Sequence, residues 1–424
     1  MSNRRTFAGF GFGPIQMGLF VYEAFSSGNF DRFVIAEVDK SLVKALRDND
    51  GRCFVNIARP DRIDRCELSG IELRDPNDPA DRAALVEAIS QASEIATCLP
   101  SVRFYDSDPA NGVAAILAES LGARSDCNPT VIYAAENNNT AAEILMREVL
   151  GHARPDDLCN VQTLNTVIGK MSGVITDPDV IDHMGLKTIT PGIDRAVLVE
   201  EFNHILVSRV TLKGFARGID VFIEKDDLLP FEEAKLYGHN AIHAMMGYLA
   251  EMRGFEVMSQ VSGDEWILSH ARKAFIEESG AMIIARHSHL GDALFTPEGY
   301  ANYADDLLKR MVNPNLNDLV DRVGRDHLRK LSFEDRLFGT MNLALEAGVR
   351  PVELSLGSAA GMISLVKRRN ELKAEIPDLP TSPEGFTRCN LGKSLRFMWG
   401  DKATARSDEL VDLTWQSIQT LLNG

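Results

Sequence analysis

The sequence predicts an α/β protein, in which a parallel sheet built from βαβ units is followed by a mostly α-helical part. Over roughly the first 200 residues, short β-rich runs alternate with helical patterns, as expected where crossover helices join successive strands. From about Leu198 onward, long amphipathic stretches dominate. We therefore expect two domains, residues 1–197 with the sheet and residues 198–424 with the helices.

The first domain has five strand-like runs with helical patterns between them. The expected strands are residues 6–9, 33–38, 53–57, 95–99 and 130–135. The expected helices are residues 17–25, 41–47, 79–92 and 112–121. Because the two kinds of element alternate, the strands are expected to lie parallel in a sheet.

The second domain is expected to consist mainly of helices. Amphipathic periodicity marks residues 230–253, 263–278, 297–309, 317–330 and 332–347. In the first of these stretches, Pro230 stands at a favourable first-turn position and Gly254 is placed to end the helix. A proline-bearing loop at residues 376–383 then leads to a last helix that carries Trp415.

Composition excludes several classes of protein. The chain is 45% hydrophobic and 25% charged, and no apolar run approaches the roughly 20 residues that span a bilayer, so we expect no membrane segment. The formal net charge of −16 argues against nucleic acid and anionic membrane surfaces as partners. An anionic small-molecule substrate would therefore need a local cluster of positive charge.

The N-terminus and the cysteines predict a cytoplasmic protein. The segment MSNRRTFAGFGFG passes from polar and basic residues directly into a strand-like run, without the apolar region of a signal peptide. Six cysteines are dispersed along the chain, with no CxxC pair and no histidine at zinc spacing. Reduced thiols are thus expected, with no metal site, in a monomer or a homodimer.

A glycine-rich turn, FGFGPIQMG, begins at Phe10. It lies between a predicted strand and a predicted helix, where a dinucleotide pyrophosphate rests on helix N-terminal amides. Gln16 stands where a third glycine is expected. The alternative is that the glycines merely make a tight turn. The residues of the turn predicted to bind the cofactor are Gly11, Gly13, Pro14, Ile15 and Gln16.

Glu37 stands near the end of the second predicted strand, 24 residues after Gly13. An acidic residue near this position accepts hydrogen bonds from the hydroxyls of the adenosine ribose. Its charge would repel a 2′-phosphate, so NAD is favoured over NADP. The alternative is that Glu37 is a solvated strand end.

A polar motif, KLYGHNAIH, lies on the predicted helix at residues 230–253 and carries Lys235, Asn240 and His243. On an α-helix Lys235 and His243 would be separated by about 80°, so only the long lysine stem could bring its amine near the imidazole. A desolvated lysine can exchange protons near neutral pH, and Glu232 could pass the proton to water. The alternative is a surface lysine beside a core histidine.

A run of basic residues with helical spacing lies between residues 322 and 330. Arg325 and Arg329 are four residues apart and, with Lys330 and Arg322, could clamp a phosphate. The alternative is a solvated helix face that offsets nearby acids.

Five segments in this order resemble the polyol-specific long-chain dehydrogenases. They are FGFGPIQMG, ENNNT at Glu136, LNTVIGKM with Asn165, KLYGHNAIH, and NPNLNDLVDRVGRDHLRKLS at residues 313–332. The resemblance spans about residues 7–365. It implies a Rossmann-type N-terminal domain, a mostly α-helical C-terminal domain, an active site between them, and no catalytic metal.

The resemblance also implies roles for individual residues. Lys235 would be the general acid/base, Asn240 would bind and polarise the reacting oxygen, and His243 would orient the substrate. Asn165 would complete the oxyanion site, and Glu232 would be a relay carboxylate. Glu136 and Asn137 would lie with the cofactor.

The activity implied is reversible hydride transfer between the carbinol carbon of a sugar alcohol and NAD. The preferred pair would be mannitol 1-phosphate and fructose 6-phosphate. A non-phosphorylated polyol or a uronate is the alternative substrate within the family. A non-catalytic NAD-binding regulatory protein is the alternative outside it, and the complete Lys235, Asn240 and His243 set weighs against that alternative.

Overall fold

A computed structural model describes residues 5–124, 128–373 and 375–423. The chain forms two compact units, Met1–Leu229 and Pro230–Gly424. The boundary predicted after residue 197 lies inside the first unit, because β11 (Ile205–Ser208) and β12 (Phe222–Lys225) complete the sheet of that unit.

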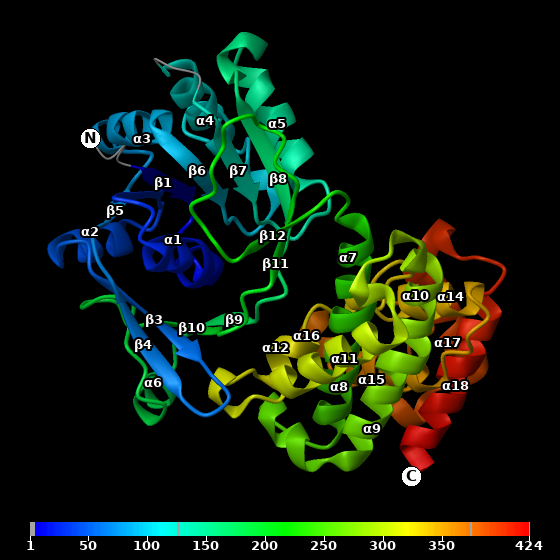
Figure 1. Ribbon diagram of the computed structural model, residues 1–424. Helices are drawn as coiled ribbons and strands as arrows, with labels where there is room; N and C mark the ends of the chain where they lie inside the picture. The colour runs from blue at the N-terminus through cyan, green and yellow to red at the C-terminus, as the bar shows by residue number, and fades with distance from the viewer. Residues whose placement is uncertain (1–4, 125–127, 374, 424) are drawn as a thin grey trace. The chain divides into compact units, whose positions relative to one another are not determined.

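The first unit is built on an eight-stranded sheet in the order β12-β11-β8-β7-β6-β1-β2-β5 (Figure 1). From β5 to β8 all neighbouring strands are parallel, whereas β11 pairs with β8 in the antiparallel sense. The α/β class is therefore confirmed. The parallel strands are β1 (Thr6–Phe10), β2 (Arg32–Ala36), β5 (Ile71–Arg74), β6 (Ala92–Thr97), β7 (Thr130–Ala134) and β8 (Val161–Val167).

Both faces of this sheet are covered, which explains why its strands are continuous apolar runs. Phe7 of β1 belongs to one buried cluster, while Ala8 and Phe10 belong to another on the opposite face. The second cluster also contains side chains of three helices that Figure 1 shows together on that side of the sheet. They are α3 (Pro79–Ser90), α4 (Val113–Gly122) and α5 (Ala141–His152).

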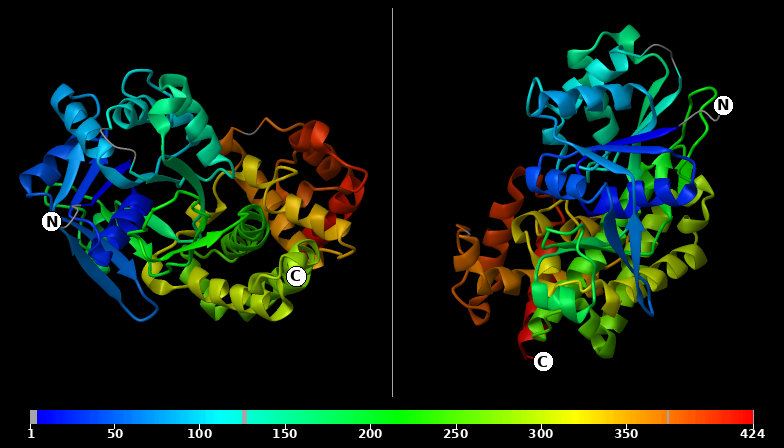
Figure 2. Two further views of the ribbon diagram at one scale, coloured as in Figure 1. Left: turned by 45° about the horizontal axis from the view of Figure 1, so that its top comes forward. Right: turned by 90° about the vertical axis from the view of Figure 1, so that its left-hand side faces the viewer.

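The strand predicted at residues 53–57 does not join the main sheet, so its placement there was wrong. It is β3 (Cys53–Ala58), which forms a hairpin with β4 (Ile63–Leu68) that extends away from the main sheet (Figures 1 and 2). The hairpin belongs to a second sheet in the order β4-β3-β10-β9. β5 takes the expected place at the edge of the main sheet beside β2.

The second unit is helical, as predicted. Its longest helix after α18 is α15, which is buried over most of its length and packs against both α8 and α18. The main helices are α8 (Ala241–Met252), α9 (Glu265–Lys273), α10 (Ala281–His287), α11 (Pro297–Met311), α14 (Phe338–Glu346), α15 (Val352–Lys367), α17 (Arg388–Trp399) and α18 (Ser407–Asn423).

Three of the predicted helices contain a wide π turn. The helix predicted at residues 17–25 begins with one, η1 (Gln16–Val21), and continues as α1 (Tyr22–Ser27). The stretch predicted as one helix at residues 230–253 consists of α7 (Leu229–Glu233), the π turn η4 (Ala234–Asn240) and α8. Likewise, α9 continues into the π turn η6 (Ala274–Gly280). A π turn has i→i+5 hydrogen bonds, so the angle of about 80° calculated for an α-helix between Lys235 and His243 is wrong.

The helix predicted at residues 317–330 is also interrupted. α12 (Val320–Gly324) ends before Arg325, which is extended, and Asp326 has a φ of +67°. α13 (His327–Lys330) then begins in a new direction. Arg325 and Arg329 are therefore not four residues apart on one helix, and this part of the phosphate-clamp prediction was wrong.

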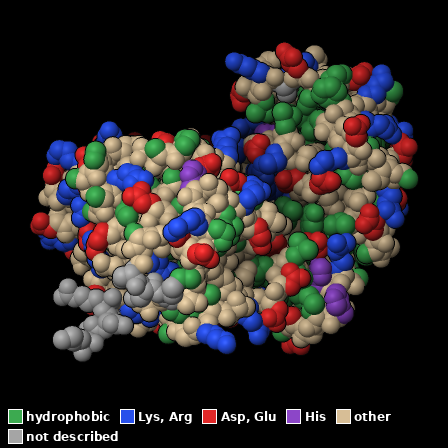
Figure 3. All heavy atoms as spheres, turned by 90° about the horizontal axis from the view of Figure 1, so that it is seen from above, with side chains coloured by type: hydrophobic (Ala, Val, Ile, Leu, Met, Phe, Trp, Pro, Cys, Tyr) green, Lys and Arg blue, Asp and Glu red, His purple; other side chains and the backbone are tan. Residues whose placement is uncertain are grey.

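Cys159 is disulfide-bonded, so the expectation of reduced thiols was wrong for this residue, whereas Cys53, Cys66, Cys98 and Cys389 are free. In the described ranges, no helix is long and apolar enough to cross a membrane. On the face shown in Figure 3, acidic and basic side chains are interspersed.

Candidate active site

The glycine turn follows β1 and lies close to the end of β6. Gly11 has a φ of +78° and its amide donates to the carbonyl of Ala36 at 2.9 Å. A Cβ at Gly11 would stand 2.8 Å from the carbonyl oxygen of Cys98, whereas a Cβ at Gly13 would meet no atom within 4 Å. The turn is therefore closed on one side and open at Gly13, which fits the close approach of a pyrophosphate.

Gln16, which replaces the expected third glycine, is accommodated by a glycine in β1. It is fully buried, and a Cβ at Gly9 would lie 1.7 Å from its Nε2. Its Oε1 accepts from the thiol of Cys98 at 2.8 Å. The close approach that a glycine permits falls instead at Gly18, where a Cβ would lie 2.5 Å from Val199. Gly9 thus provides the space for the Gln16 side chain, and Gly18 provides it for the π turn that begins at Gln16.

The Glu37 carboxylate lies directly against the glycine turn. Its Oε2 accepts from the amide of Phe12 at 2.7 Å. Its Oε1 accepts from the amides of Val38 and Asp39 at 2.7 and 2.9 Å. A carboxylate offers about four acceptor positions, so three contacts leave one for a ribose hydroxyl. Glu37 also holds the turn, and its contact with the cofactor stays a prediction.

Glu136 follows β7 and is almost completely buried. It accepts from the Thr97 hydroxyl at 2.9 Å, from the Leu99 amide at 2.8 Å and from the Tyr105 hydroxyl. Burial raises the pKa of Glu136 above its usual value. The carboxylate therefore ties the ends of β6 and β7 together, while its neighbour Asn137 is exposed.

These predicted cofactor residues share one edge of the sheet. The glycine turn follows β1, Glu37 follows β2, and Glu136 follows β7. Since these strands are parallel, their carboxyl ends lie together, and this is the edge where ligands bind in open α/β sheets.

Asn165 lies in β8, where it is paired with Ala134 of β7. Its Oδ1 accepts from the amide of Ala142 at 2.8 Å, at the start of α5, and its Nδ2 donates to Glu143 at 2.8 Å. An asparagine side chain has two N–H donors, so one remains beyond the contact with Glu143. The side chain is thus held in place with a donor to spare, which is what the predicted oxyanion role requires.

Lys235 lies in the π turn η4 of the second unit and is half-buried. Burial lowers the pKa of Lys235 to about 8; Glu232 opposes this shift and the charge of Arg336 adds to it. An amine with this pKa can give and take protons near neutral pH.

His243, in the first half of α8, faces a buried carboxylate. Its Nε2 lies 3.1 Å from Oδ2 of Asp318, whose side chain is 2% exposed. Arg322 holds the other oxygen of Asp318, with Nη2 at 2.6 Å and Nε at 2.8 Å. Burial would raise the pKa of Asp318, but His243 and Arg322 lower it below the usual value. The sequence prediction missed Asp318 as a candidate site residue. Because Arg322 pairs with Asp318, this arginine binds an acid of the protein, although it was predicted to bind phosphate.

His239 is a second residue that the prediction missed. It lies in η4 one residue before Asn240, and its ring centroid is 6.1 Å from that of His243. Burial, followed by the proximity of His243, lowers the pKa of His239 well below its usual value, so this ring is neutral at physiological pH. The spacing of four residues between His239 and His243 could have indicated from the sequence that the two rings lie close together.

The cations predicted to bind phosphate are largely engaged by other groups. Arg329 contacts Asp326 at 2.5 Å and Asp335 at 3.3 Å. Lys330 is buried and donates to the carbonyl of Val323, and burial lowers the pKa of its amine to about 7. Arg325 is exposed. This arrangement is closer to the solvated, acid-paired alternative than to a preformed clamp.

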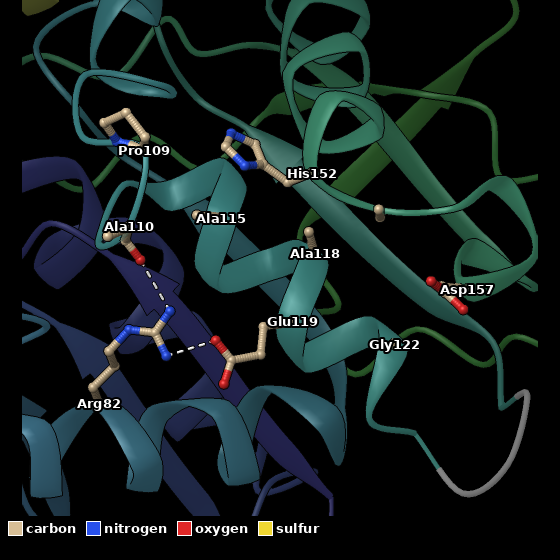
Figure 4. Close-up of a pocket in the computed structure, with 10 residues that line it drawn as sticks. Arg82, Pro109, Ala110, Ala115, Ala118, Glu119, Gly122, His152 and Asp157 are labelled. Atoms are coloured by element: carbon tan, nitrogen blue, oxygen red, sulfur yellow. Dashed lines mark hydrogen bonds and ion pairs between the residues drawn. The ribbon is translucent and has the colours of Figure 1, made fainter.

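A separate pocket lies on the first unit, against α3, α4 and α5 (Figure 4). Arg82 crosses it, pairing with Glu119 at 2.6 Å and donating to the carbonyl of Ala110 at 3.0 Å. The residues that line this pocket include none of those predicted to bind the cofactor. Within the part of the chain that the structure describes, no three metal-ligating side chains gather in one place.

Comparison with known sequences identifies the second unit. Residues 227–380 match the family model of the mannitol dehydrogenase C-terminal domain. The chain is 27% identical over 352 residues to the mannitol-1-phosphate 5-dehydrogenase of Shouchella clausii (strain KSM-K16), covering 82% of this chain and 85% of that one. It is also 27% identical over 338 residues to the enzyme of the same name from Pseudarthrobacter chlorophenolicus, covering 78% of each chain.

Solved structures with the same fold cover the whole chain. A D-sorbitol dehydrogenase in substrate-free form has a TM-score of 0.71 at 14% identity and covers 99% of this chain and 98% of its own. The mannitol 2-dehydrogenase of Pseudomonas fluorescens, in a ternary complex with NAD and D-mannitol, has a TM-score of 0.69 at 15% identity and covers 100% and 92%.

The Rossmann-type sheet and the matched helical domain define a two-part dehydrogenase architecture. Residues 227–380 thus match the mannitol dehydrogenase C-terminal domain, and the chain is similar in sequence to mannitol-1-phosphate 5-dehydrogenases.

Proposed function

We propose that this chain is a polyol dehydrogenase that transfers hydride reversibly between the carbinol carbon of a sugar alcohol and NAD. The preferred pair is mannitol 1-phosphate and fructose 6-phosphate. The observation that carries the proposal is Lys235, whose pKa is lowered to about 8, in the part of the chain that matches the mannitol dehydrogenase C-terminal domain. A cytoplasmic location and a monomeric or dimeric state stay predictions.

In this proposal the nicotinamide cofactor accepts or returns the hydride. Lys235 takes the hydroxyl proton as the hydride leaves, and Glu232 passes it to water. N–H donors from Asn165 and Asn240 hold the oxygen while negative charge develops on it, and one such donor is worth about 3 kcal/mol. In ketone reduction Lys235 donates the proton.

His243 orients the substrate in this proposal. A buried carboxylate beside Nε2 favours the hydrogen on that nitrogen, which leaves Nδ1 as the acceptor for a substrate hydroxyl. The full Lys235, Asn240 and His243 set favours an enzyme over a non-catalytic NAD-binding protein, because a regulatory protein has no chemical need for all three.

The choice of NAD over NADP depends on Glu37. We expect kcat/KM to be much higher with NADH than with NADPH, and Glu37→Ser to narrow the ratio by about 10-fold or more, because the repulsion of a 2′-phosphate and the ribose contact are lost. Glu37→Gln is the matched control for the glycine turn, since it keeps an acceptor for the Phe12 amide without the charge. Equal use of both cofactors by the unmodified protein would rule out this role.

A neutral polyol or a sugar acid is the second candidate substrate. The observation in its favour is that Arg329 and Lys330 already contact acids or a backbone carbonyl.

Arg329→Met distinguishes the two candidates, because it keeps aliphatic bulk and removes the guanidinium. If Arg329 binds phosphate, kcat/KM for fructose 6-phosphate should fall roughly 10- to 150-fold while kcat/KM for fructose is unchanged. Arg350→Met, at an exposed arginine of the second unit outside this cluster, reports the effect of net charge alone. The substrate is a neutral polyol or a sugar acid if Arg329→Met lowers kcat/KM equally for both compounds. The same conclusion holds if the unmodified protein prefers fructose or a keto-acid.

A further inference from the structure

The carbonyl of Tyr237 lies in the middle of the π turn η4, between Lys235 and His243 in the sequence. In an α-helix it would accept from the amide of Ala241, four residues ahead. The amide of Ala241 donates to the carbonyl of Gly238. The Tyr237 carbonyl accepts at 2.9 Å from the hydroxyl of Ser279, which belongs to another π turn of the second unit, η6.

Tyr300 of α11 completes this contact from a buried position. Its hydroxyl lies 3.0 Å from Ser279 Oγ. Because Ser279 has one hydroxyl hydrogen and donates it to Tyr237, Tyr300 is the donor between these two side chains. A hydroxyl relay therefore runs from Tyr300 through Ser279 to the backbone of η4.

Two glycines make room for Tyr300 between the π turns. A Cβ at Gly238 of η4 would lie 2.6 Å from the Tyr300 hydroxyl oxygen, and a Cβ at Gly280 of η6 would lie 2.7 Å from Tyr300 Cδ1. Tyr300 is fully buried. Its hydroxyl thus has a fixed place, and the two π turns approach each other where they lack side chains.

α14 supports the same carbonyl from another direction. Thr340 Oγ1 lies 3.2 Å from the Tyr237 carbonyl oxygen and closer to the carbonyl of Arg336, so its single hydrogen is shared between the two oxygens. A Cβ at Gly339 would lie 3.1 Å from Tyr237 Cε1, so the tyrosine ring packs directly on α14. Hydroxyl groups from two elements thus reach one backbone oxygen.

We propose that Ser279 and Tyr300, assisted by Thr340, are positioning residues that hold η4 as a wide turn and thereby set where Lys235 stands relative to Asn240 and His243. In an α-helix the Tyr237 carbonyl would be aligned with the amide of Ala241, so hydroxyl groups that bind this carbonyl from outside the helix favour the wide turn over an α-helical one. Reversion to an α-helix would turn Lys235 by about 100° against His243. The inference deepens the proposed function and rests on it.

Ser279→Ala tests the relay directly, because it removes the donor to Tyr237 and little volume. We expect kcat to fall roughly 10- to 100-fold with unchanged affinity for NADH, since a misplacement of about 1 Å can lower the rate 10²-fold. Tyr300→Phe, which removes only the hydroxyl at the far end of the relay, should act in the same direction with a smaller loss.

Ser358→Ala is the matched control. Ser358 is also a buried serine in the second unit, and its hydroxyl lies 3.0 Å from that of Thr414. Its loss should lower thermal stability by a similar amount and leave kcat unchanged. If Ser279→Ala does not fold, Tyr300→Phe and Ser358→Ala still form a comparable pair.

A second readout does not need turnover. The Lys235 amine, dimethylated with a carbon-13 label, can be titrated by NMR, with the signal assigned by its absence in Lys235→Arg. The groups whose charges act on Lys235 are Glu232 of its own segment and Arg336, and His239 lies close by. If the wide turn relaxes, Lys235 becomes more hydrated and its pKa should rise toward the ordinary value.

These measurements separate the two proposals. Absence of turnover with any polyol or ketose would refute the proposed function, while a rise in the Lys235 pKa in Ser279→Ala, but not in Ser358→Ala, would still support the positioning role. An unchanged kcat and an unchanged Lys235 titration in both Ser279→Ala and Tyr300→Phe would overturn the inference.

Discussion

Lys235→Ala should lower turnover by about 10²-fold or more while NADH still binds. General acid/base catalysis typically contributes 10²–10⁴ to a rate, and Lys235 lies in the matched domain with a pKa of about 8 that suits that role. The measurements are steady-state turnover and NADH binding by fluorescence. Affinity for NADH should be retained because the predicted cofactor residues lie in the first unit.

The pKa of Lys235 also predicts whether the rate rises or falls with pH. In polyol oxidation Lys235 must be unprotonated to accept the hydroxyl proton, so the rate should rise as the pH passes about 8. In ketose reduction it must be protonated, so the rate should fall over the same range. Lys273→Ala is the matched control, because this exposed lysine lies directly before another π turn, η6, whereas Lys235 lies within η4. Near-normal turnover of Lys235→Ala would show that the lysine is structural.

Asp318→Asn should lower kcat/KM roughly 10- to 100-fold and also destabilise the protein. The substitution keeps the side-chain volume but removes the charge that faces His243 at 3.1 Å, so the imidazole loses its fixed orientation. It also weakens the contact with Arg322, and a hydrogen bond to a charged group contributes about 1.5–3 kcal/mol to the free energy of unfolding.

Asp318→Asn should also change how the free energy of unfolding depends on pH in the acidic range. The pKa of Asp318 is lowered in the folded protein, so its stabilising contribution is present above the pKa of an unfolded aspartate and is lost as the pH falls through the lowered value. Asp321→Asn, at an exposed acid in the same segment, is the control and should leave turnover unchanged. If Asp318→Asn loses stability but keeps kcat/KM, Asp318 supports the scaffold without positioning His243.

The strands of the main sheet could be predicted because burial on both faces produces continuous apolar runs. Such a run does not reveal which strand is its neighbour. β3 resembles the others in sequence, yet it pairs with β4 in a hairpin and leaves its expected place to β5. Pairing depends on the short connection after β3 and on contacts with β10, which are distant in the chain.

The residues of the candidate site were named from the sequence and stay predictions, whereas the geometry of the segment that carries Lys235 could not be foreseen. Helical periodicity cannot detect the wide turn at η4, because the hydroxyls that hold it belong to Ser279 and Thr340, far away in the sequence. The same is true of Asp318, whose partner His243 is 75 residues earlier. The break at Asp326 depends on a positive φ that its residue type does not require.

The measurement that tests the central claim most directly is the oxidation of NADH by the purified protein with a panel of ketoses, ketose phosphates and keto-acids. We expect NADH to be consumed with fructose 6-phosphate at a rate well above that with any other compound, and Lys235→Ala to abolish this consumption. Absence of NADH oxidation with every member of the panel would contradict the assignment of this chain as a polyol dehydrogenase.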